Sequence, residues 1–260
     1  MIKLENTNVY GWEAAIRGMR NPMNSWGKSD SAFAHGDGYM RTLDGDREKA
    51  VDFVFREFNE GREYQPNILD QSYVGPNDHD LMMRLAKAGS VDAKYRRMLN
   101  VTVDITAPLY WWKEFDTYKV GTVANSCSTM HKIHSKEFTT DDFSWEHLLN
   151  NGLDLFEFVW ENGMFAKNVQ PIDFLTMFVI PSLNKCREKF LETKDKVYWW
   201  QMIQLLPSSY NQRRTVQLNY EVLAGIYPKR KDHKLDEWHD FCDWINGLPY
   251  SELITLEESA

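Results

Sequence analysis

Three arginines and an asparagine near the C-terminal end of the chain are residue types that bind phosphate. Arg213, Arg214 and Arg230 flank Asn219 in the sequence. A planar guanidinium group donates two parallel hydrogen bonds to a phosphate group, so arginine suits this anion better than lysine does. This grouping predicts a nucleotide site built from Arg230 and Asn219, with help from Arg213 or Arg214. The alternative is that the arginines lie on the surface and form ion pairs with Glu221 and Glu237.

A second polar group lies near the middle of the chain. Asn125, Ser126 and Ser128 offer amide and hydroxyl groups there. Cys127 lies between two serines and near His131, so a cysteine nucleophile is an alternative use of this segment. Such a nucleophile needs a lowered pKa and a base close in space, and spacing alone shows neither.

Two helices are expected to carry the C-terminal arginines, between residues 205 and 244. Ser209 and Gln212 have the spacing of a capping box, which predicts that the first helix begins there. Its apolar face is formed at helical spacing by Val216, Tyr220, Leu223 and Tyr227. Pro228 is expected to end this helix, because proline has no N–H and clashes with the preceding turn. The second helix has an apolar face formed by Leu235, Trp238, Cys242 and Ile245.

The middle polar group is expected to follow a strand and a helix. Apolar and polar residues alternate over residues 98–106, which predicts a strand with one buried face. Helical spacing follows over residues 109–119, and Gly121 is expected to end that helix.

Helices are predicted for most of the remaining chain. The N-terminal half shows helical periodicity over residues 10–20 and 46–58, and Asp78 is the expected N-cap of a helix that ends at Ala88. One or two helices are expected over residues 141–160. A mostly helical run broken at Pro181 is expected over residues 171–206. No linker or repeat divides the sequence, so we expect a single domain over residues 1–260.

The order of several of these residues resembles the flavin-dependent thymidylate synthase family. That family has a Leu-Pro, a helix with Asn-x-Arg-x-Leu, a later Arg, and a His-Ala-Gln-x-Glu-Ile segment. This chain has a similar order in Leu206-Pro207, Asn219, Leu223, Arg230, His233 and Glu237. Trp112, Asn125 and Ser128 match a second family region. The chain departs from the pattern in lacking the family's Arg-His-Arg, which is replaced by Lys113, Glu114, Phe115 and Asp116.

The resemblance implies an α+β fold in which an antiparallel sheet is flanked by helices. The family-like core would span about 80–135 and 200–250, with an added helical segment at about 140–200. The family methylates dUMP at C5 with folate as carbon donor and reduced flavin as hydride donor, and it forms homotetramers. The implied ligands are therefore a pyrimidine nucleotide, FAD and folate, with further copies of the chain as partners. The resemblance is also consistent with a divergent C5 modification of the pyrimidine. Because the Arg-His-Arg is absent, the alternative is an inactive nucleotide-binding module, a sensor or ligand sink on the same fold.

The resemblance and the residue types together give a set of candidate site residues. Arg230 is the candidate catalytic residue, since the family's Arg orients the nucleotide. The candidate nucleotide-binding residues are Arg230, Asn219, Arg213, Arg214, Asn125, Ser126 and Ser128. The candidate cofactor-binding residues are Trp112, Lys113, Lys119, His131 and His233.

Composition limits the other possibilities. The 260 residues carry a formal net charge of −8, which argues against a nucleic-acid polymer as partner. No stretch approaches the roughly 18 consecutive apolar residues of a membrane span. Three widely separated cysteines suit a reducing compartment, so we expect a cytoplasmic protein without disulfides. The histidines do not form the closed set of three or four ligands that zinc requires, so no metal site is expected.

Overall fold

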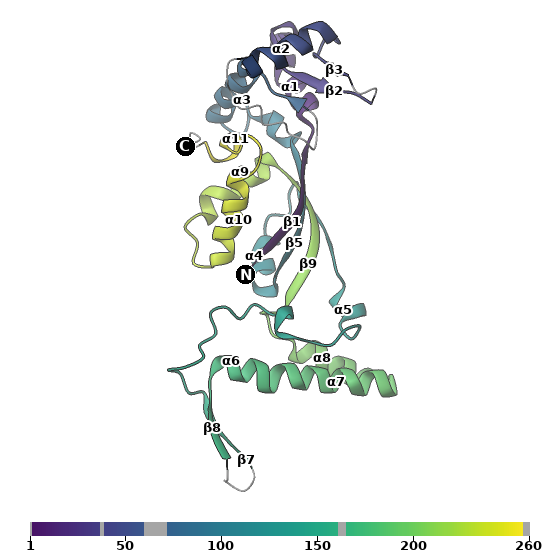
Figure 1. The fold of residues 1–260 in the computed structure, drawn as a ribbon, viewed down its shortest axis with the longest axis vertical. Helices are drawn as coiled ribbons and strands as arrows, with labels where there is room; N and C mark the ends of the chain where they lie inside the picture. The colour runs from purple at the N-terminus through teal and green to yellow at the C-terminus, as the bar shows by residue number, and fades with distance from the viewer. Residues whose placement is uncertain (1, 37–38, 60–71, 161–164, 257–260) are drawn as a thin grey trace. The chain divides into compact units, whose positions relative to one another are not determined.

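The computed structural model describes residues 2–36, 39–59, 72–160 and 165–256, and the chain divides into two compact units (Figure 1). Unit 1 comprises Met1–Lys3, Thr106–Thr117 and Asn125–Arg214. Unit 2 comprises Leu4–Ile105, Tyr118–Ala124 and Thr215–Ala260.

Four strands form the main sheet, in the order β1-β5-β9-β6. They are β1 (Lys3–Tyr10), β5 (Asn100–Pro108), β6 (Val123–Ser126) and β9 (Asn211–Asn219). The strand predicted over residues 98–106 is confirmed by β5, in which Val101, Val103 and Ile105 are buried. On the polar face, Asp104 accepts hydrogen bonds from Asn6 Nδ2 at 2.8 Å and Thr215 Oγ1 at 2.5 Å. Side chains from three neighbouring strands therefore fix the register there.

Unit 2 gathers helices from both ends of the chain. They are α1 (Trp12–Arg20), α2 (Arg47–Asn59), α3 (Pro76–Ala88), α9 (Tyr220–Arg230), α10 (Asp236–Asn246) and α11 (Glu252–Thr255), with 3-10 turns at Asn21–Met23, Trp26–Lys28 and Lys94–Arg97. The helices predicted over residues 10–20, 46–58 and 78–88 are confirmed by α1, α2 and α3. Trp12 and Tyr220 are fully buried and meet edge to face with centroids 5.9 Å apart. A small antiparallel sheet has the order β3-β2-β4, made by Ala32–Ala34 (β2), Met40–Arg41 (β3) and Ser72–Tyr73 (β4).

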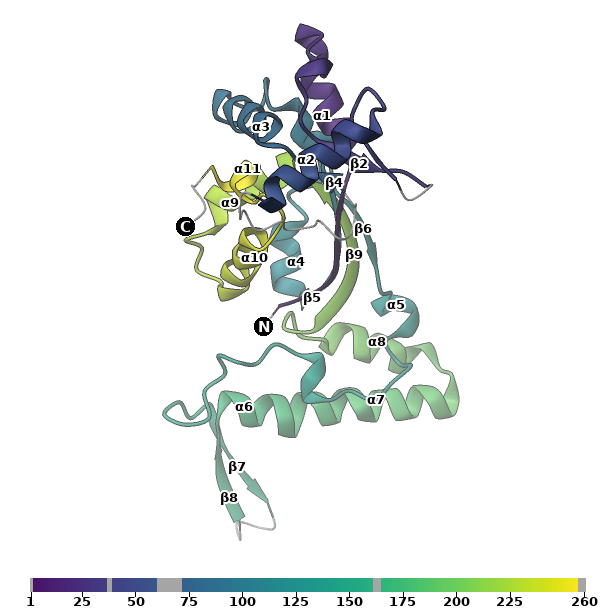
Figure 2. The same ribbon diagram turned by 45° about the horizontal axis from the view of Figure 1, so that its top comes forward.

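Unit 1 is built around a pair of helices, α7 (Ile180–Thr193) and α8 (Lys196–Leu205) (Figure 2). A short helix α6 (Pro171–Asp173) and a π-helical turn (Phe174–Val179) lead into α7. The other elements are α4 (Leu109–Phe115), α5 (Thr129–Lys132), a 3-10 turn at Thr140–Asp142, and the antiparallel hairpin β7 (Phe156–Trp160) and β8 (Phe165–Val169). The core beneath the helix pair contains Ile133, Phe138, Phe143, Leu175, Ile180, Leu183 and Met202.

The helix predicted to begin at Ser209 is wrong, because residues 211–219 form strand β9. In β9, Val216 and Leu218 are buried while Arg213, Thr215 and Gln217 are exposed, which is the two-residue period of a strand. The helical face assigned to this segment combined Val216 of the strand with residues of α9. The prediction that Pro228 ends the helix is also wrong, since α9 continues to Arg230. Pro228 has no N–H to bond to the Ala224 carbonyl, but only two residues of α9 follow it, so the lost bond and the local clash affect only the end of the helix.

Two details of the predicted 140–200 helical segment are also wrong. Residues 141–160 hold a 3-10 turn and strand β7 instead of helices, and β7 alternates Phe156, Glu157, Phe158 in the pattern of a strand. The run after residue 171 is broken at Lys194 and Asp195 rather than at Pro181. Pro181 is the second residue of α7 and directly follows the π-helical turn, so the helical run changes its hydrogen-bonding pattern before the proline and continues through it. Lys194 has a left-handed backbone, and Asp195 caps α8 through Val197 N.

Candidate functional site

The pairing of β6 with β9 brings two parts of the predicted nucleotide site together. These strands are neighbours in the sheet, and Cys127 N, just beyond β6, donates to Arg213 O at 2.9 Å. Gln212 Nε2 donates to Cys127 O at 3.0 Å from the other direction. Arg213 and Ser128 therefore lie close together, although 84 residues separate them in the sequence.

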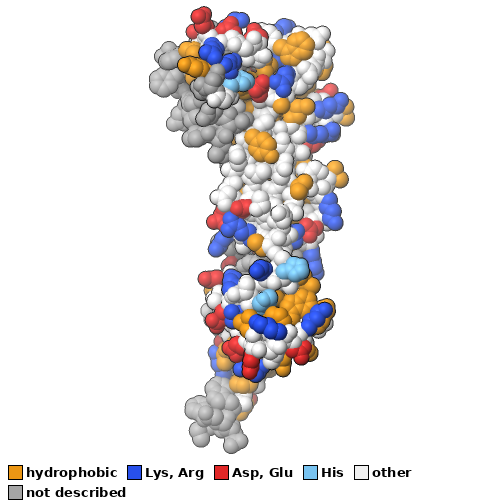
Figure 3. All heavy atoms as spheres, turned by 90° about the vertical axis from the view of Figure 1, so that its right-hand side faces the viewer, with side chains coloured by type: hydrophobic (Ala, Val, Ile, Leu, Met, Phe, Trp, Pro, Cys, Tyr) orange, Lys and Arg blue, Asp and Glu red, His pale blue; other side chains and the backbone are white. Residues whose placement is uncertain are grey.

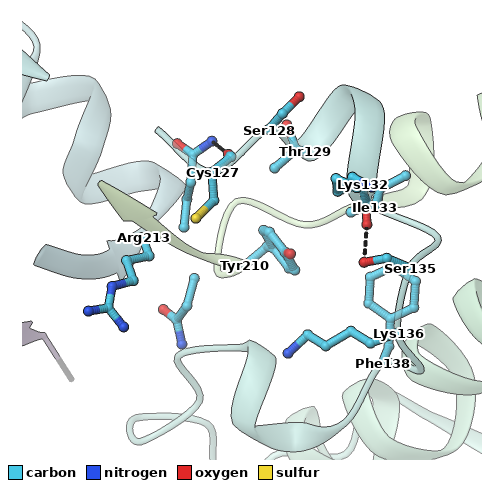
Figure 4. Close-up of a pocket in the computed structure, with 12 residues that line it drawn as sticks. Cys127, Ser128, Thr129, Lys132, Ile133, Ser135, Lys136, Phe138, Tyr210 and Arg213 are labelled. Atoms are coloured by element: carbon cyan, nitrogen blue, oxygen red, sulfur yellow. Dashed lines mark hydrogen bonds between the residues drawn. The ribbon is translucent and has the colours of Figure 1, made fainter. Parts of the chain in front are cut away.

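A cavity of about 330 Å³ in unit 1 lies at this point (Figure 4). Hydroxyl and amide groups and cationic side chains share its lining with the rings of Phe138 and Tyr210. Small-molecule sites commonly combine apolar walls with a few placed polar groups. The lining residues are Cys127, Ser128, Thr129, Lys132, Ile133, Ser135, Lys136, Phe138, Tyr210, Asn211, Gln212 and Arg213.

Positive charge and a phenol characterise the cavity. Lys136 forms an ion pair with Asp142, whereas Lys132 is exposed and has no ion-pair partner among the described residues. Tyr210 packs edge to face against Phe143 with centroids 5.8 Å apart. Burial raises the pKa of the Tyr210 phenol, and the nearby Asp142 charge adds to this effect. Tyr210 therefore stays protonated at neutral pH.

The middle polar group lies on a strand and on the short helix that follows it. Asn125 and Ser126 are exposed residues of the outer strand β6. Ser128 caps α5, because its hydroxyl accepts a hydrogen bond from His131 N at 3.1 Å. His131 is an exposed residue of α5. Of these four, Ser128 lines the cavity.

Arg213 and Arg214 lie on opposite faces of β9 and differ in their surroundings. Arg213 is exposed and lines the cavity. Arg214 Nη1 lies 2.8 Å from Asp116 Oδ1, and its Nε donates to Gln212 Oε1 at 3.0 Å. Its guanidinium carbon also lies 4.0 Å from the centroid of the Trp112 ring. Of the two arginines, Arg213 is therefore placed to contact a ligand in the cavity. Arg214 instead joins Asp116, Gln212 and Trp112 on the other face of β9.

The residues around α4 do not fit the FAD that the resemblance implies. The pyrophosphate of FAD needs cations or N–H donors, and Lys113 is the cation that the turn at residues 113–116 offers. Phe115 is buried and stacks on Trp111 with centroids 5.0 Å apart, and Asp116 pairs with Arg214. Trp112 is 1% exposed, and its Nε1 donates to Gln212 O at 2.9 Å. Its covered ring is not open to stack on a flavin.

The other predicted site residues lie in unit 2. Arg230 Nε donates to the Tyr118 hydroxyl at 2.9 Å, and its guanidinium carbon lies 4.4 Å from the centroid of the Trp238 ring. His233 Nδ1 accepts from Leu235 N at 3.1 Å, which shapes the turn after α9. Lys119 is exposed. These contacts give Arg230 and His233 structural roles, and their ligand-binding roles stay predictions.

Asn219 caps helix α9, since its Oδ1 accepts from Val222 N at 3.0 Å. We expect Asn219→Ala to lower the free energy of unfolding by about 1 kcal/mol, because the first turn of α9 loses a hydrogen-bond acceptor. Asn219→Asp is the matched control and should keep most of the stability. Denaturant unfolding followed by circular dichroism measures both variants. An Asn219→Asp variant as unstable as Asn219→Ala would contradict a capping role.

The sequence interpretation missed several residues of the cavity. Lys132, Lys136 and Tyr210 bring two cations and a ring to it, and Thr129 and Ser135 add hydroxyls. The available signal was the cluster of Lys132 and Lys136 among the histidines that follow Ser128. Among the described residues, no three His, Cys, Asp or Glu side chains gather closely enough to hold a metal ion. Nor does any helix in the described ranges have the length and apolar character that crossing a membrane requires.

Solved structures are similar to this chain over its whole length, although neither a protein-family model nor a curated protein sequence matches it. A flavin-dependent thymidylate synthase from Helicobacter pylori, complexed with FAD and dUMP, has a TM-score of 0.56 at 13% identity, covering 98% of this chain and 97% of that one. A second structure of thymidylate synthase X from Helicobacter pylori with FAD and dUMP has a TM-score of 0.55 at 13% identity, covering 98% of each chain. The UMP/dUMP methylase PolB from Streptomyces cacaoi, bound to 5-Br dUMP, has a TM-score of 0.53 at 10% identity, covering 98% and 94%. The chain therefore has the α+β fold of the flavin-dependent thymidylate synthases, as the order of its motifs predicted.

Proposed function

We propose that this chain is a divergent relative of the flavin-dependent thymidylate synthases and binds a pyrimidine nucleoside monophosphate in the unit 1 cavity. The observation that carries the proposal is that Arg213, Ser128 and Lys132 line one cavity that also has an aromatic wall. The similar solved structures contain dUMP or 5-Br dUMP, which supports a ligand of this class.

The cavity offers separate groups for the two ends of such a nucleotide. Arg213 and Lys132 supply positive charge for the phosphate, with Ser128 and Thr129 as hydroxyl donors. Tyr210 and Phe138 supply flat apolar surface for the base and sugar. Tyr210 is a protonated phenol at neutral pH, and burial raises its pKa further, so its hydroxyl is a hydrogen-bond donor to a base carbonyl. These residues bind and orient the ligand.

A second candidate function is C5 methylation of the bound nucleotide with folate and reduced flavin. It is favoured by the full-length likeness to structures that contain both FAD and dUMP. When bound, flavin supplies the hydride of that reaction. The α4 region does not fit the FAD pyrophosphate, so we favour nucleotide binding without a resident flavin. A visible absorption spectrum of the purified protein, repeated after addition of FAD and dUMP and gel filtration, separates the two. A retained flavin band would favour the enzyme.

The reactivity of Cys127 gives a direct test of where the nucleotide binds. Cys127 is exposed in the cavity, whereas burial raises the pKa of Cys186 and raises that of Cys242 to about 11. We therefore expect iodoacetamide near pH 8 to alkylate Cys127 first, since their raised pKa values leave the other two cysteines with little thiolate. Added dUMP should slow this alkylation several-fold, as followed by mass spectrometry of the modified peptide. Deoxyuridine, which lacks the phosphate, should protect less.

Titration calorimetry with dUMP completes the test. Lys132→Ala should weaken binding about tenfold, because one charged contact to phosphate is worth roughly 1.5 kcal/mol or more. Lys189→Ala is the matched control, since Lys189 is a half-exposed residue of α7 that pairs with Glu192 and lies outside the cavity. The proposal fails if dUMP neither binds nor protects Cys127, or if the two lysine variants behave alike.

A further inference from the structure

Exposed apolar side chains concentrate in one part of unit 1. Fourteen of the 24 large apolar side chains found exposed among the described residues lie between positions 145 and 205. Figure 3 is turned so that the right-hand side of Figure 1, where α5 and the turn from α7 to α8 lie, faces the viewer. Apolar side chains lie there among lysine, arginine and histidine side chains. Large exposed apolar patches mark interaction surfaces in soluble proteins.

Three of these exposed side chains, Phe156, Phe158 and Val159, lie in strand β7 of the hairpin β7–β8. Its two strands pair only with each other in the described part of the chain, with Phe156 opposite Val169 and Phe158 opposite Lys167. In Figures 1 and 2 the hairpin extends away from α6 with no other strand beside it. An isolated two-stranded hairpin is marginally stable in water, and both of its outer edges carry backbone groups that can pair with another strand.

A cluster of phenylalanines covers one face of the hairpin. Phe178 lies 5.6 Å from Phe156, 5.2 Å from Phe158 and 5.9 Å from Phe174, measured between ring centroids. Phe156, Phe158 and Phe174 nevertheless stay 41%, 36% and 43% exposed. Beside them is a small apolar cavity of about 150 Å³, lined by Phe174, Phe178, Val179, Ser182 and Leu205. The hairpin is thus fixed to the π-helical turn by rings that remain half open to solvent.

The two edges of the hairpin differ in charge. Strand β8 has Lys167 at its centre, and Lys167 Nζ pairs with Asp173 at 2.6 Å. Pairing two β8 edges about a two-fold axis would place the two lysines opposite each other and crowd both ion pairs. Strand β7 has Phe158 at its centre, and the same operation there places Phe158 opposite Phe158 and Glu157 opposite Val159 of the other copy. No like charges meet in this second arrangement, and the phenylalanine faces of both copies lie on the same side of the joined sheet.

We propose that β7 pairs antiparallel with β7 of a second copy of this chain, forming a two-fold symmetric four-stranded sheet centred on Phe158. The pairing satisfies an open strand edge and joins two half-exposed phenylalanine clusters into one apolar surface. The edge of β7 would then be one contact surface for the self-association that the family resemblance implies. It does not depend on the nucleotide proposal, since no residue of the unit 1 cavity takes part.

A charge pair at position 159 tests both the interface and its register. Val159 is 47% exposed and faces away from the phenylalanine cluster, so its replacement should leave the fold intact. Val159→Glu places a carboxylate opposite Glu157 of the second copy and should weaken self-association at least tenfold. Val159→Lys is the matched control, because it places an ammonium group opposite the same carboxylate and should keep the association. Sedimentation equilibrium measures the association of both, and thermal unfolding checks that both are folded.

Disulfide trapping provides an independent readout. Phe158→Cys in a Cys127→Ser background places two thiols opposite each other on the two-fold axis, and mild oxidation should give a covalent dimer in high yield. Val120→Cys in the same background is the control, since Val120 is 92% exposed and outside the hairpin. A monomeric wild-type protein would overturn the proposal. So would equal association of the two Val159 variants, or equal cross-linking of the two cysteine variants.

Discussion

Replacing Asp78 with alanine is expected to lower the free energy of unfolding by about 3–5 kcal/mol. Asp78 is fully buried in unit 2 and accepts hydrogen bonds from Arg20 Nε at 2.5 Å, Ser29 Oγ at 2.6 Å and Ser31 Oγ at 2.6 Å. Arg20 is itself 4% exposed, so the substitution leaves a buried guanidinium without its carboxylate. For a chain of this size the loss corresponds to a fall in Tm of roughly 6–20 °C.

The same helix offers a matched control for this prediction. Asp80 also pairs with an arginine, Arg84, at 2.9 Å, but both side chains are 67% exposed. Asp80→Ala should cost about 0–1 kcal/mol, because solvent screens an exposed ion pair. Chemical denaturation of both variants, together with the Arg20→Ala single and double variants, gives the coupling energy between Asp78 and Arg20. If Asp78→Ala and Asp80→Ala have equal stabilities, the buried network does not contribute as argued.

Asp78 also shows what sequence patterns could and could not predict in this fold. The helix around it was predicted correctly, because apolar periodicity is local information. Its role as N-cap was wrong, since Pro76 is the first residue of α3 and Gly75 occupies the cap position. Asp30 accepts a hydrogen bond from Asn77 N across 47 residues of sequence. Arg20 pairs with Asp78 across 58 residues. Contacts over such separations leave no periodic trace in one sequence.

Strand β9 illustrates a related limit. Val216 and Leu218 alternate with the exposed Thr215 and Gln217, but Tyr220 and Leu223 follow without a break, and the combined apolar run fits a helical face. The true boundary lies at Asn219, which ends the strand and caps the helix. Strand β1 was missed for the opposite reason, because its sequence KLENTNVY alternates poorly. Pairing with β5 in the sheet, rather than local propensity, makes it a strand.

Two residues that line the cavity were among the candidates, because residue type or motif order was enough to select them. Arginine chemistry identified Arg213, and the resemblance added Ser128, and both line the unit 1 cavity. The sequence did not distinguish Arg213 from Arg214, because that difference depends on which face of β9 each occupies. Lys132 and Tyr210 were missed because only the packing of α5 against the residues before β9 brings them to the cavity.

The two adjacent arginines are expected to have opposite effects when replaced. Arg213→Ala should change the free energy of unfolding by less than about 0.5 kcal/mol, since Arg213 is exposed, yet weaken dUMP binding about 10- to 100-fold through loss of a charged phosphate contact. Arg214→Ala should instead cost about 2–3 kcal/mol of stability. It removes the ion pair to Asp116, the hydrogen bond to Gln212 and the contact with the Trp112 ring together.

Lysine substitutions separate charge from shape at the same two positions. Arg213→Lys keeps a cation in the cavity and should recover part of the dUMP affinity. Arg214→Lys should recover little stability, because an ammonium group cannot lie flat on Trp112 while also contacting Asp116 and Gln212. Calorimetric titration and thermal unfolding of all four variants measure the two properties side by side. Loss of dUMP affinity in Arg214→Ala alone, with Arg213→Ala unchanged, would move the phosphate site to the other face of β9 and remove Arg213 from it.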